Sequence, residues 1–251
     1  MPERDHAQLR LAVDLTILTV RENRLQVLVI TRANQPFRSR RALPGGFLRV
    51  DEDVYAAALR ELREETGLDG SELHLEQLPV YGAPDRDPRG RIVSVPYLAM
   101  MPDLPLPTAG SDASSAAWMP VDDVLGTLAF DHDAILSGAV EKARERLEFT
   151  TLATAFCESP FTIGDLRNVY EVVWGQRLDP RNFSRKVVNT EGFVTPTGSK
   201  RVPEIGRPAA LYVRGPEIAL NPPILRTGSR SEPAGRQPEA GIVRLGQAAR
   251  G

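Results

Sequence analysis

The stretch that most constrains the fold of this chain runs from Gly46 to Leu68, GFLRVDEDVYAAALRELREETGL. It begins in a turn, because Gly45 and Gly46 follow Pro44 and glycine readily takes the positive φ that a tight turn needs. Residues 53–66 then contain neither Gly nor Pro, so a helix is expected there. Its buried stripe is predicted from apolar side chains that recur at helical spacing: Tyr55, Leu59 and Leu62.

Three glutamates, Glu61, Glu64 and Glu65, lie three and four residues apart and therefore share one side of the predicted helix. Clustered carboxylates repel one another and raise one another's pKa, so they are either left in water or neutralised by a partner. Two interpretations follow. The cluster is either a solvated face on which Arg60 and Glu64 form an i, i+4 ion pair, or a site for Mg²⁺ or Mn²⁺, which take oxygen ligands.

The spacing favours the cation site. Nine residues match a 23-residue signature at every defined position: Gly46, Glu52, Arg60, Glu61, Leu62, Glu64, Glu65, Gly67 and Leu68. Through this stretch, here called the box, the chain resembles the Nudix hydrolase family, whose members cleave nucleoside diphosphates linked to another group. The resemblance implies an α+β fold, an α/β/α sandwich with a mixed sheet. It also implies that Glu61, Glu64 and Glu65 hold Mg²⁺ or Mn²⁺ and act in catalysis, with the Gly46 carbonyl near the metal.

The composition is that of an ordinary globular protein, with 41% apolar and 25% charged residues in a chain of 251. No apolar run is long enough to span a bilayer, and the polar N-terminus lacks the apolar core of a signal peptide. Cys157 is the single cysteine, which excludes an internal disulfide. We therefore expect a cytoplasmic protein without membrane contact.

Charge is distributed unevenly along the chain. Residues 1–159 carry 17 basic and 25 acidic side chains, whereas residues 160–214 carry 9 and 5, and residues 215–251 carry 5 and 3. An acidic front and a basic back suggest two domains with different partners, and nucleic acid is a candidate partner for the basic one.

Apolar runs around the box predict the strands of a sheet. Residues 9–20 and 25–30 form a predicted hairpin, and residues 73–81 and 92–101 two further strands. A long helix is expected over residues 131–149, where it closes the first domain.

The loop GAPDRDPRGR, residues 82–91, separates the last two of these strands. Its Pro, Gly and Asp residues suit an ordinary long turn, while its arginine forks suit phosphate. It resembles the PDRDPRGR loop of Nudix proteins that handle ADP-ribose, and this favours a ligand contact by its charged residues: Asp85, Arg86, Asp87, Arg89 and Arg91. Asp112, in a later loop, is a candidate catalytic base, although a solvated loop residue is the favoured interpretation of it.

From residue 160 the pattern changes to helix, turn, helix and hairpin, the order of a winged helix-turn-helix. Thr162 and Asp165 form a predicted capping box at the start of the first helix, and Asp179-Pro180 starts the second. A polar hairpin tip is expected at residues 197–201.

On the second helix, Phe183 and Val187 are spaced to face inward. A generic two-helix packing module would show the same spacing. However, Arg and Asn on the exposed side can read guanine and adenine edges in the major groove, and basic hairpin residues can reach phosphates. The expected DNA contacts are Arg181, Asn182, Arg185, Lys186, Asn189, Lys200 and Arg201.

Both halves together resemble the Nudix-related transcriptional regulators of bacterial NAD metabolism. The matching segments include ALPGGFLRVDEDV, GAPDRDPRGRIVSVPYLA and FTIGDLRNVYEVVWGQRLDPRNFSRKV. The resemblance implies a Nudix domain at residues 8–149 and a winged helix-turn-helix DNA-binding domain at residues 150–214. It also implies a homodimeric repressor of NAD biosynthesis or salvage genes, which binds a palindromic double-stranded operator and senses ADP-ribose or a related nucleotide. Residues 215–251, rich in Pro and Gly, are expected to be a flexible tail.

The intact box keeps a second function open. The chain would then be an active ADP-ribose or nucleoside-diphosphate-sugar pyrophosphatase with an accessory C-terminal domain, in which the bound metal bridges the diphosphate and activates a water. Whether the box of a regulator would still turn over substrate is left undecided by the sequence.

Overall fold

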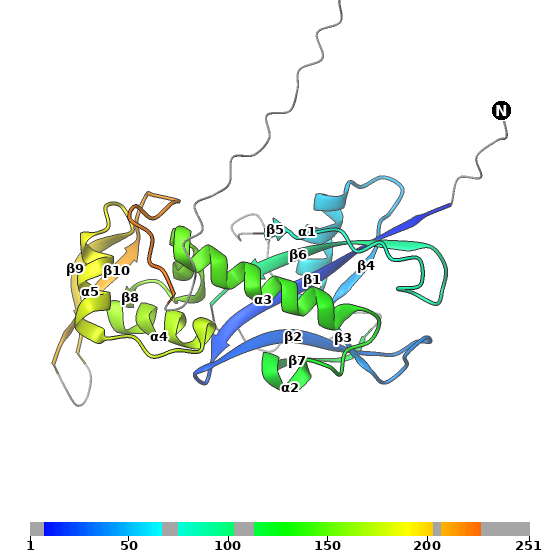
Figure 1. Ribbon diagram of the computed structural model, residues 1–251, viewed down its shortest axis with the longest axis horizontal. Helices are drawn as coiled ribbons and strands as arrows, with labels where there is room; N and C mark the ends of the chain where they lie inside the picture. The colour runs from blue at the N-terminus through cyan, green and yellow to red at the C-terminus, as the bar shows by residue number, and fades with distance from the viewer. Residues whose placement is uncertain (1–7, 67–74, 103–112, 203–206, 227–251) are drawn as a thin grey trace, which may run out of the picture.

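The computed structural model describes residues 8–66, 75–102, 113–202 and 207–226. Its first half is a seven-stranded mixed sheet between helix α1 (Val54–Thr66) and helix α3 (His132–Phe149), which confirms the predicted α/β/α sandwich (Figure 1). The strands are β1 (Arg10–Arg21), β2 (Arg24–Arg32), β3 (Arg41–Ala42), β4 (Gly45–Phe47), β5 (Leu75–Gln77), β6 (Ile92–Met100) and β7 (Ala113–Pro120). A short helix, α2 (Val121–Val124), follows β7.

Strand β1 lies at the centre of the sheet. It forms the predicted antiparallel hairpin with β2, and the turn residues Glu22 and Asn23 have φ of 51° and 56°. On its other side β1 runs parallel to β6. Its first half also pairs with the short strand β4, which sets Gly45 opposite Asp14. The box turn is therefore held against the middle of the central strand.

The strand predicted over residues 73–81 is wrong for most of its length. Strand β5 covers only Leu75–Gln77, and Tyr81 makes an isolated bridge to Ser94. Pro79 lies between the two paired segments and has no amide hydrogen to donate, so it interrupts the ladder. Residues 73 and 74 lie outside the described residues.

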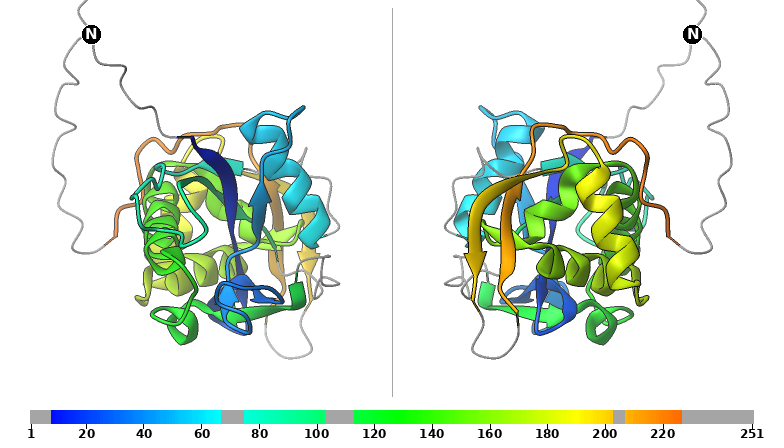
Figure 2. Two further views of the ribbon diagram at one scale, coloured as in Figure 1. Left: turned by 90° about the vertical axis from the view of Figure 1, so that its right-hand side faces the viewer. Right: turned by 90° about the vertical axis from the view of Figure 1, so that its left-hand side faces the viewer.

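The two faces of the sheet are both buried, because alternate strand residues point to opposite sides. Leu15 and Leu28 join α1 in one apolar cluster, while Leu18 and Leu98 join α3 in another. In Figure 2 the cyan helix α1 and the green helix α3 lie on opposite sides of the strands.

The buried side of α1 differs from the predicted stripe. Tyr55 is 48% exposed, whereas Ala57, Ala58 and Leu62 are fully buried against the sheet. The helix thus packs on the strands with small side chains, and the tyrosine ring stays at the rim of this contact.

The second half is a winged helix, as predicted. Its elements are β8 (Phe161–Thr162), α4 (Ile163–Trp174), α5 (Pro180–Asn189), β9 (Val194–Arg201) and β10 (Ala209–Arg214), and its sheet has the order β8-β10-β9. The capping box is present: the Asp165 amide donates to Thr162 Oγ1 at 3.1 Å and the Thr162 amide to Asp165 Oδ2 at 2.8 Å. Asp179 caps α5 by accepting from the Asn182 amide at 2.8 Å.

The predicted hairpin tip at residues 197–201 is wrong, because these residues belong to strand β9. Gly198 has φ of 79°, and the register with β10 shifts between Ala210 and Tyr212. A glycine in this conformation accommodates the extra residues of a bulge, so pairing continues as far as Arg201. The turn of the hairpin includes residues 203–206, which lie outside the described residues.

One apolar cluster runs through both halves of the molecule. It contains Leu136 and Val140 of α3, and it continues into Leu166 and Tyr170 of α4. A 3-10 helix, η2 (Thr151–Phe156), joins α3 to the winged helix within the same cluster. The two halves therefore share a core and are joined by more than a linker. None of the helices in the described ranges is long and apolar enough to cross a membrane.

The flexible tail expected over residues 215–251 is wrong for residues 215–226, because these pack against the protein; we call them the C-terminal strap (orange in Figure 1). Two backbone hydrogen bonds connect the strap to the end of α3. The Leu220 amide donates to the Phe149 carbonyl at 2.8 Å, and the Ile224 amide donates to the Glu148 carbonyl at 2.9 Å. Leu220 and Ile224 are 6% and 3% exposed. Residues 227–251 lie outside the described residues.

Candidate functional site

A cavity of about 170 Å³ opens where β1, β2 and β4 meet the 82–91 loop and the start of α3. Its walls combine box glycines, charged loop residues and the residues that lead into α3: Asp14, Arg32, Gly45, Gly46, Phe47, Arg86, Asp87, Arg89, Phe130 and His132. The cavity therefore lies beside the box and has both acidic and basic walls.

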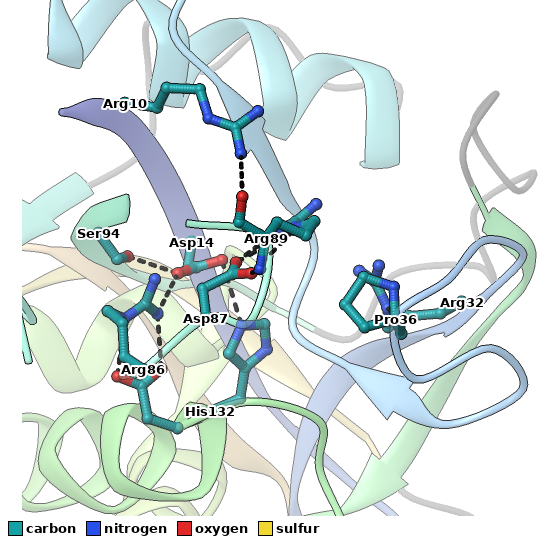
Figure 3. A network of polar contacts seen from close by, with 10 residues as sticks. Arg10, Asp14, Arg32, Pro36, Arg86, Asp87, Arg89, Ser94 and His132 are labelled. Carbon is teal, nitrogen blue, oxygen red and sulfur yellow. Dashed lines mark hydrogen bonds and ion pairs between the residues drawn. The ribbon is translucent and has the colours of Figure 1, made fainter. Parts of the chain in front are cut away.

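Asp14 is the centre of a polar network in this cavity (Figure 3). Ser94 Oγ of the neighbouring strand donates to Asp14 Oδ2, and Arg86 Nη2 lies 3.6 Å from the same oxygen. Arg86 also makes two hydrogen bonds to Asp131, at 2.8 and 2.5 Å. Burial disfavours the charged guanidinium, but Asp131 and Asp14 outweigh it and raise the pKa of Arg86.

His132, the first residue of α3, completes the network. Its Nδ1 accepts a hydrogen bond from the Leu43 amide, so the ring proton resides on Nε2, which faces Asp14 Oδ1 at 3.5 Å. Burial lowers the pKa of His132, against the opposing effect of Asp14. The imidazole therefore acts as a neutral connector between α3 and the box turn.

Several members of this network were missed in the sequence: Asp14, Ser94, Asp131 and His132. They come from separate parts of the chain and meet only in the fold. One signal was available, because Asp14 is the single acid in the mainly apolar run LRLAVDLTILTV, and a charge in a buried strand requires a partner.

The residues predicted in the 82–91 loop divide into two groups. Arg86, Asp87 and Arg89 line the cavity. Asp85 is exposed and does not line it, and Arg91 instead donates to the Gly82 carbonyl at 2.6 Å, closing the base of the loop. Burial alone would raise the pKa of Asp87, but the ion pair with Arg89, 2.6 Å from Nη2 to Oδ2, lowers it.

The box glutamates occupy different environments. Glu61 and Glu65 are buried, at 7% and 8% exposure, while the Glu64 side chain is 46% exposed. Arg60 lies 2.6 Å from Glu61 and 2.7 Å from Glu52, and this pairing lowers the pKa of Glu52 to about 2. Burial raises the pKa of Glu61 in spite of Arg60. The solvated-face interpretation therefore applies only to Glu64.

Gly46 lies directly against Glu61. A Cβ at residue 46 would lie 2.0 Å from Glu61 Oε1, so only glycine leaves this carboxylate its place beside the box turn. In the part of the chain that the structure describes, no three carboxylate, imidazole or thiol side chains converge as a complete metal cage. The carboxylate donors and the adjacent glycine backbone nevertheless suit a hard cation that takes some of its oxygen ligands from the protein and the others from a substrate. Asp112 lies outside the described residues.

The predicted DNA-contacting side chains of α5 are all exposed: Arg181, Asn182, Arg185, Lys186 and Asn189. Phe183 and Val187 are buried on the opposite side, at 3% and 0% exposure. Arg185 Nη2 donates to Asn182 Oδ1 at 2.8 Å, so the two polar side chains form a connected surface.

The two predicted DNA contacts in the wing, the hairpin of β9 and β10, are arranged differently. Lys200 is exposed on β9. Arg201 is also exposed, but it pairs with Asp165 at 2.8 Å and donates to the Pro160 carbonyl, so it joins the wing to the start of α4.

Two family models match the chain, the NUDIX domain over residues 9–138 and the NrtR DNA-binding winged helix domain over residues 154–213. The chain is 34% identical over 211 residues to the ADPR responsive transcriptional repressor NtrR of Acinetobacter baylyi, an alignment that covers 83% of each protein. This chain belongs to the NrtR family.

The fold of this NrtR-family chain also resembles the crystal structure of Shewanella oneidensis NrtR complexed with a 27mer DNA, with a TM-score of 0.71 and 33% identity over 82% of this chain and 94% of that one. Its Nudix half is 42% identical over 111 residues to the ADP-ribose pyrophosphatase of Methanocaldococcus jannaschii. This alignment covers 44% of this chain and 63% of the pyrophosphatase. The family thus combines the two halves that the sequence predicted.

Proposed function

We propose that this chain is a transcriptional repressor of NAD-metabolism genes whose affinity for its operator changes when ADP-ribose binds the Nudix half. The observation that carries this proposal is that α3 begins at the charged cavity and ends against the winged helix. The A. baylyi relative, named as an ADPR responsive repressor, and the S. oneidensis relative, crystallised with DNA, support it.

The cavity suits a diphosphate joined to ribose. Arg86 and Arg89 have planar forks that can bind phosphate oxygens in pairs, and Asp87 can accept from ribose hydroxyls. Both arginines are now paired with carboxylates of the protein, Arg86 with Asp131 and Arg89 with Asp87. A bound diphosphate competes for these arginines and changes the partners of Asp131, the residue immediately before α3.

Helix α3 provides the route from the cavity to the DNA-binding half. Near its far end Arg144 Nε donates to the Val173 carbonyl at 2.9 Å, and Trp174 Nε1 donates to the Arg144 carbonyl at 3.2 Å. These two bonds hold the end of α4 to α3. A shift at the start of α3 therefore alters the position of α4 and, through it, of α5.

In this proposal, the protein binds a palindromic operator as a homodimer. Helix α5 has 10 residues and can read only a few base pairs, so two copies related by a twofold axis give the required specificity. Sedimentation of the free protein and of its DNA complex tests this point, and a monomer in both measurements would contradict it.

A gel shift with a promoter fragment of an NAD-biosynthesis gene tests the central claim. We expect retardation at low salt, a loss of affinity as salt rises, and a change in affinity when ADP-ribose is added. AMP, which lacks the diphosphate and the second ribose, is the matched control ligand. Absence of DNA binding at low salt by the folded chain would disprove the regulator function.

The intact box supports a second function, hydrolysis of ADP-ribose with Mg²⁺ or Mn²⁺. Glu61, Glu64 and Glu65, with the Gly46 carbonyl, would hold the ion, which when bound neutralises charge on the diphosphate and activates a water. The buried carboxylates Glu61 and Glu65 beside Gly46, and the likeness to an ADP-ribose pyrophosphatase, favour this activity.

Glu64→Gln and Glu65→Gln proteins distinguish the two functions. If hydrolysis disappears while DNA binding and its response to ADP-ribose persist, the protein is a regulator with residual chemistry. Rapid turnover by the wild type without DNA binding would instead establish the enzyme. Calorimetry with Mn²⁺ in the presence of ADP-ribose tests the metal assignment itself, and no detectable metal binding would refute it.

A further inference from the structure

Phe130 has an unusual backbone for a bulky residue. Its φ is 57°, in the left-handed region that side chains other than those of Gly, Asn and Asp rarely adopt. Such a conformation is strained and persists where the surroundings determine it, which occurs often at ligand sites. The residue immediately precedes Asp131, and its ring lines the cavity.

The ring of Phe130 contacts two other rings and two guanidinium groups. The His132 ring lies beside it, with centroids 5.2 Å apart and planes at 36°. Phe37 packs edge-on against it, with centroids 4.9 Å apart and planes at 78°. The guanidinium carbons of Arg32 and Arg89 lie over the ring, 4.7 and 5.1 Å from its centroid. A planar group over an aromatic face is the arrangement that a stacked nucleobase also adopts.

Arg89 meets a second ring at the same time. Its guanidinium carbon lies 5.0 Å from the centroid of Phe47, which directly follows Gly46 of the box turn. Among the described residues that line the cavity, Phe47 and Phe130 supply the phenyl rings. The third aromatic wall residue, His132, uses Nδ1 to hold the Leu43 amide and is 5% exposed, so its face is less available to a ligand.

We propose that Phe130 is the stacking platform for the purine base of the nucleotide, and that the base takes the place of the Arg89 guanidinium on its ring. This inference rests on the proposed function, because it assigns the base end of the ligand in the same cavity. The Phe130 ring already lines the cavity, and Phe37 packs against it. Arg89, displaced from the ring, remains beside Asp87 and near the diphosphate.

Calorimetry of the full chain with ADP-ribose tests the platform in Phe130→Leu and Phe130→Tyr proteins. Leucine and tyrosine strain the backbone as phenylalanine does, but only tyrosine can stack. Stacking of a base on an aromatic ring accounts for roughly tenfold to a hundredfold in affinity. We therefore expect Phe130→Leu to weaken binding by that factor and Phe130→Tyr to bind within about twofold of the wild type. Phe149→Leu, at the exposed far end of α3, is the matched control and leaves the affinity unchanged.

Two further measurements separate stacking from a general loss of structure. The fluorescence of ethenoadenosine-diphosphoribose should change on binding to the wild type and to Phe130→Tyr, and much less with Phe130→Leu. Operator affinity without ligand should be the same in all three proteins. If the wild type binds ADP-ribose and Phe130→Leu binds it equally well with the same fluorescence change, the platform is wrong while the proposed function stands. A folded wild type that binds no ADP-ribose overturns both.

Discussion

His132 Nδ1 accepts a hydrogen bond of 2.9 Å from the backbone amide of Leu43. This bond joins the first residue of α3 to the residue before Pro44, where the box turn begins. Both partners are buried, with His132 at 5% and Leu43 at 2% exposure. The helix that leads to the DNA-binding half is thereby fixed to the turn that carries Gly45 and Gly46.

Replacing His132 by Phe should destabilise the protein. Phenylalanine fills the ring volume but cannot accept, so the Leu43 amide would be left buried without a partner, at a cost of about 1–3 kcal/mol. His132→Gln, whose side chain can still accept a hydrogen bond, should cost less. Urea unfolding at pH 8 measures both, and equal stability of wild type and His132→Phe would show that the bond contributes nothing.

The neutral state of His132 predicts a pH dependence. Burial lowers its pKa in the folded protein below the usual value of about 6.5, so on acidification the unfolded chain takes up a proton before the native one does. The stability that this residue contributes is complete above about pH 6.5 and is lost as the pH falls toward its folded pKa. The stability difference between wild type and His132→Gln should therefore shrink from pH 8 to pH 5. If the stability difference between the two proteins is constant with pH, His132 has the same pKa in the folded and in the unfolded protein, and the prediction is wrong.

Because the C-terminal strap is packed against the protein, we expect a truncation that removes it to lower the stability, and one that leaves it in place to have little effect. A chain ending at Arg214 loses the burial of Leu220 and Ile224, worth about 1.5–3 kcal/mol each, and leaves Glu148, 3% exposed, without its Arg226 partner. Its melting temperature should fall by several degrees. A chain ending at Arg226 keeps the contacts of residues 215–226 described above and is the matched control. Equal melting temperatures for the two truncations would contradict a packing role for the strap.

Local signals explain what the sequence could predict. The helix of the box, the capping box of Thr162 and Asp165, and the start of α5 at Pro180 each depend on residues within a few positions of one another. The inward side of α5 was likewise predicted because Phe183 and Val187 are one helical turn apart. In each case the signal lies within one short stretch of the sequence.

The cavity and the strap depend on contacts between distant segments. Asp14, Arg86 and His132 meet only because β1, the 82–91 loop and α3 converge, and no spacing along the chain records this. The proline and glycine content of the strap predicts disorder, whereas the end of α3 offers it backbone partners and an apolar surface. Burial of Leu220 is decided by that surface and not by its neighbours in the sequence.

The exposed face of α5 and the wing predict two different effects on DNA binding. Arg185, which holds Asn182 at 2.8 Å, belongs to the surface that would read base edges, while Lys200 on β9 would meet phosphates. Arg185→Ala should cost about 1–3 kcal/mol with the operator and reduce the preference for operator over unrelated DNA. Lys200→Ala should weaken binding to both DNAs similarly and lower the slope of log affinity against log salt by about one.

The charge-matched control is Arg38→Ala, which removes an exposed arginine of the Nudix half and should change neither the preference for the operator nor the salt dependence. Fluorescence anisotropy with operator and scrambled duplexes over a range of salt concentrations measures all three proteins, and a uniform loss in Arg185→Ala would mean that this residue contacts the backbone and reads no base.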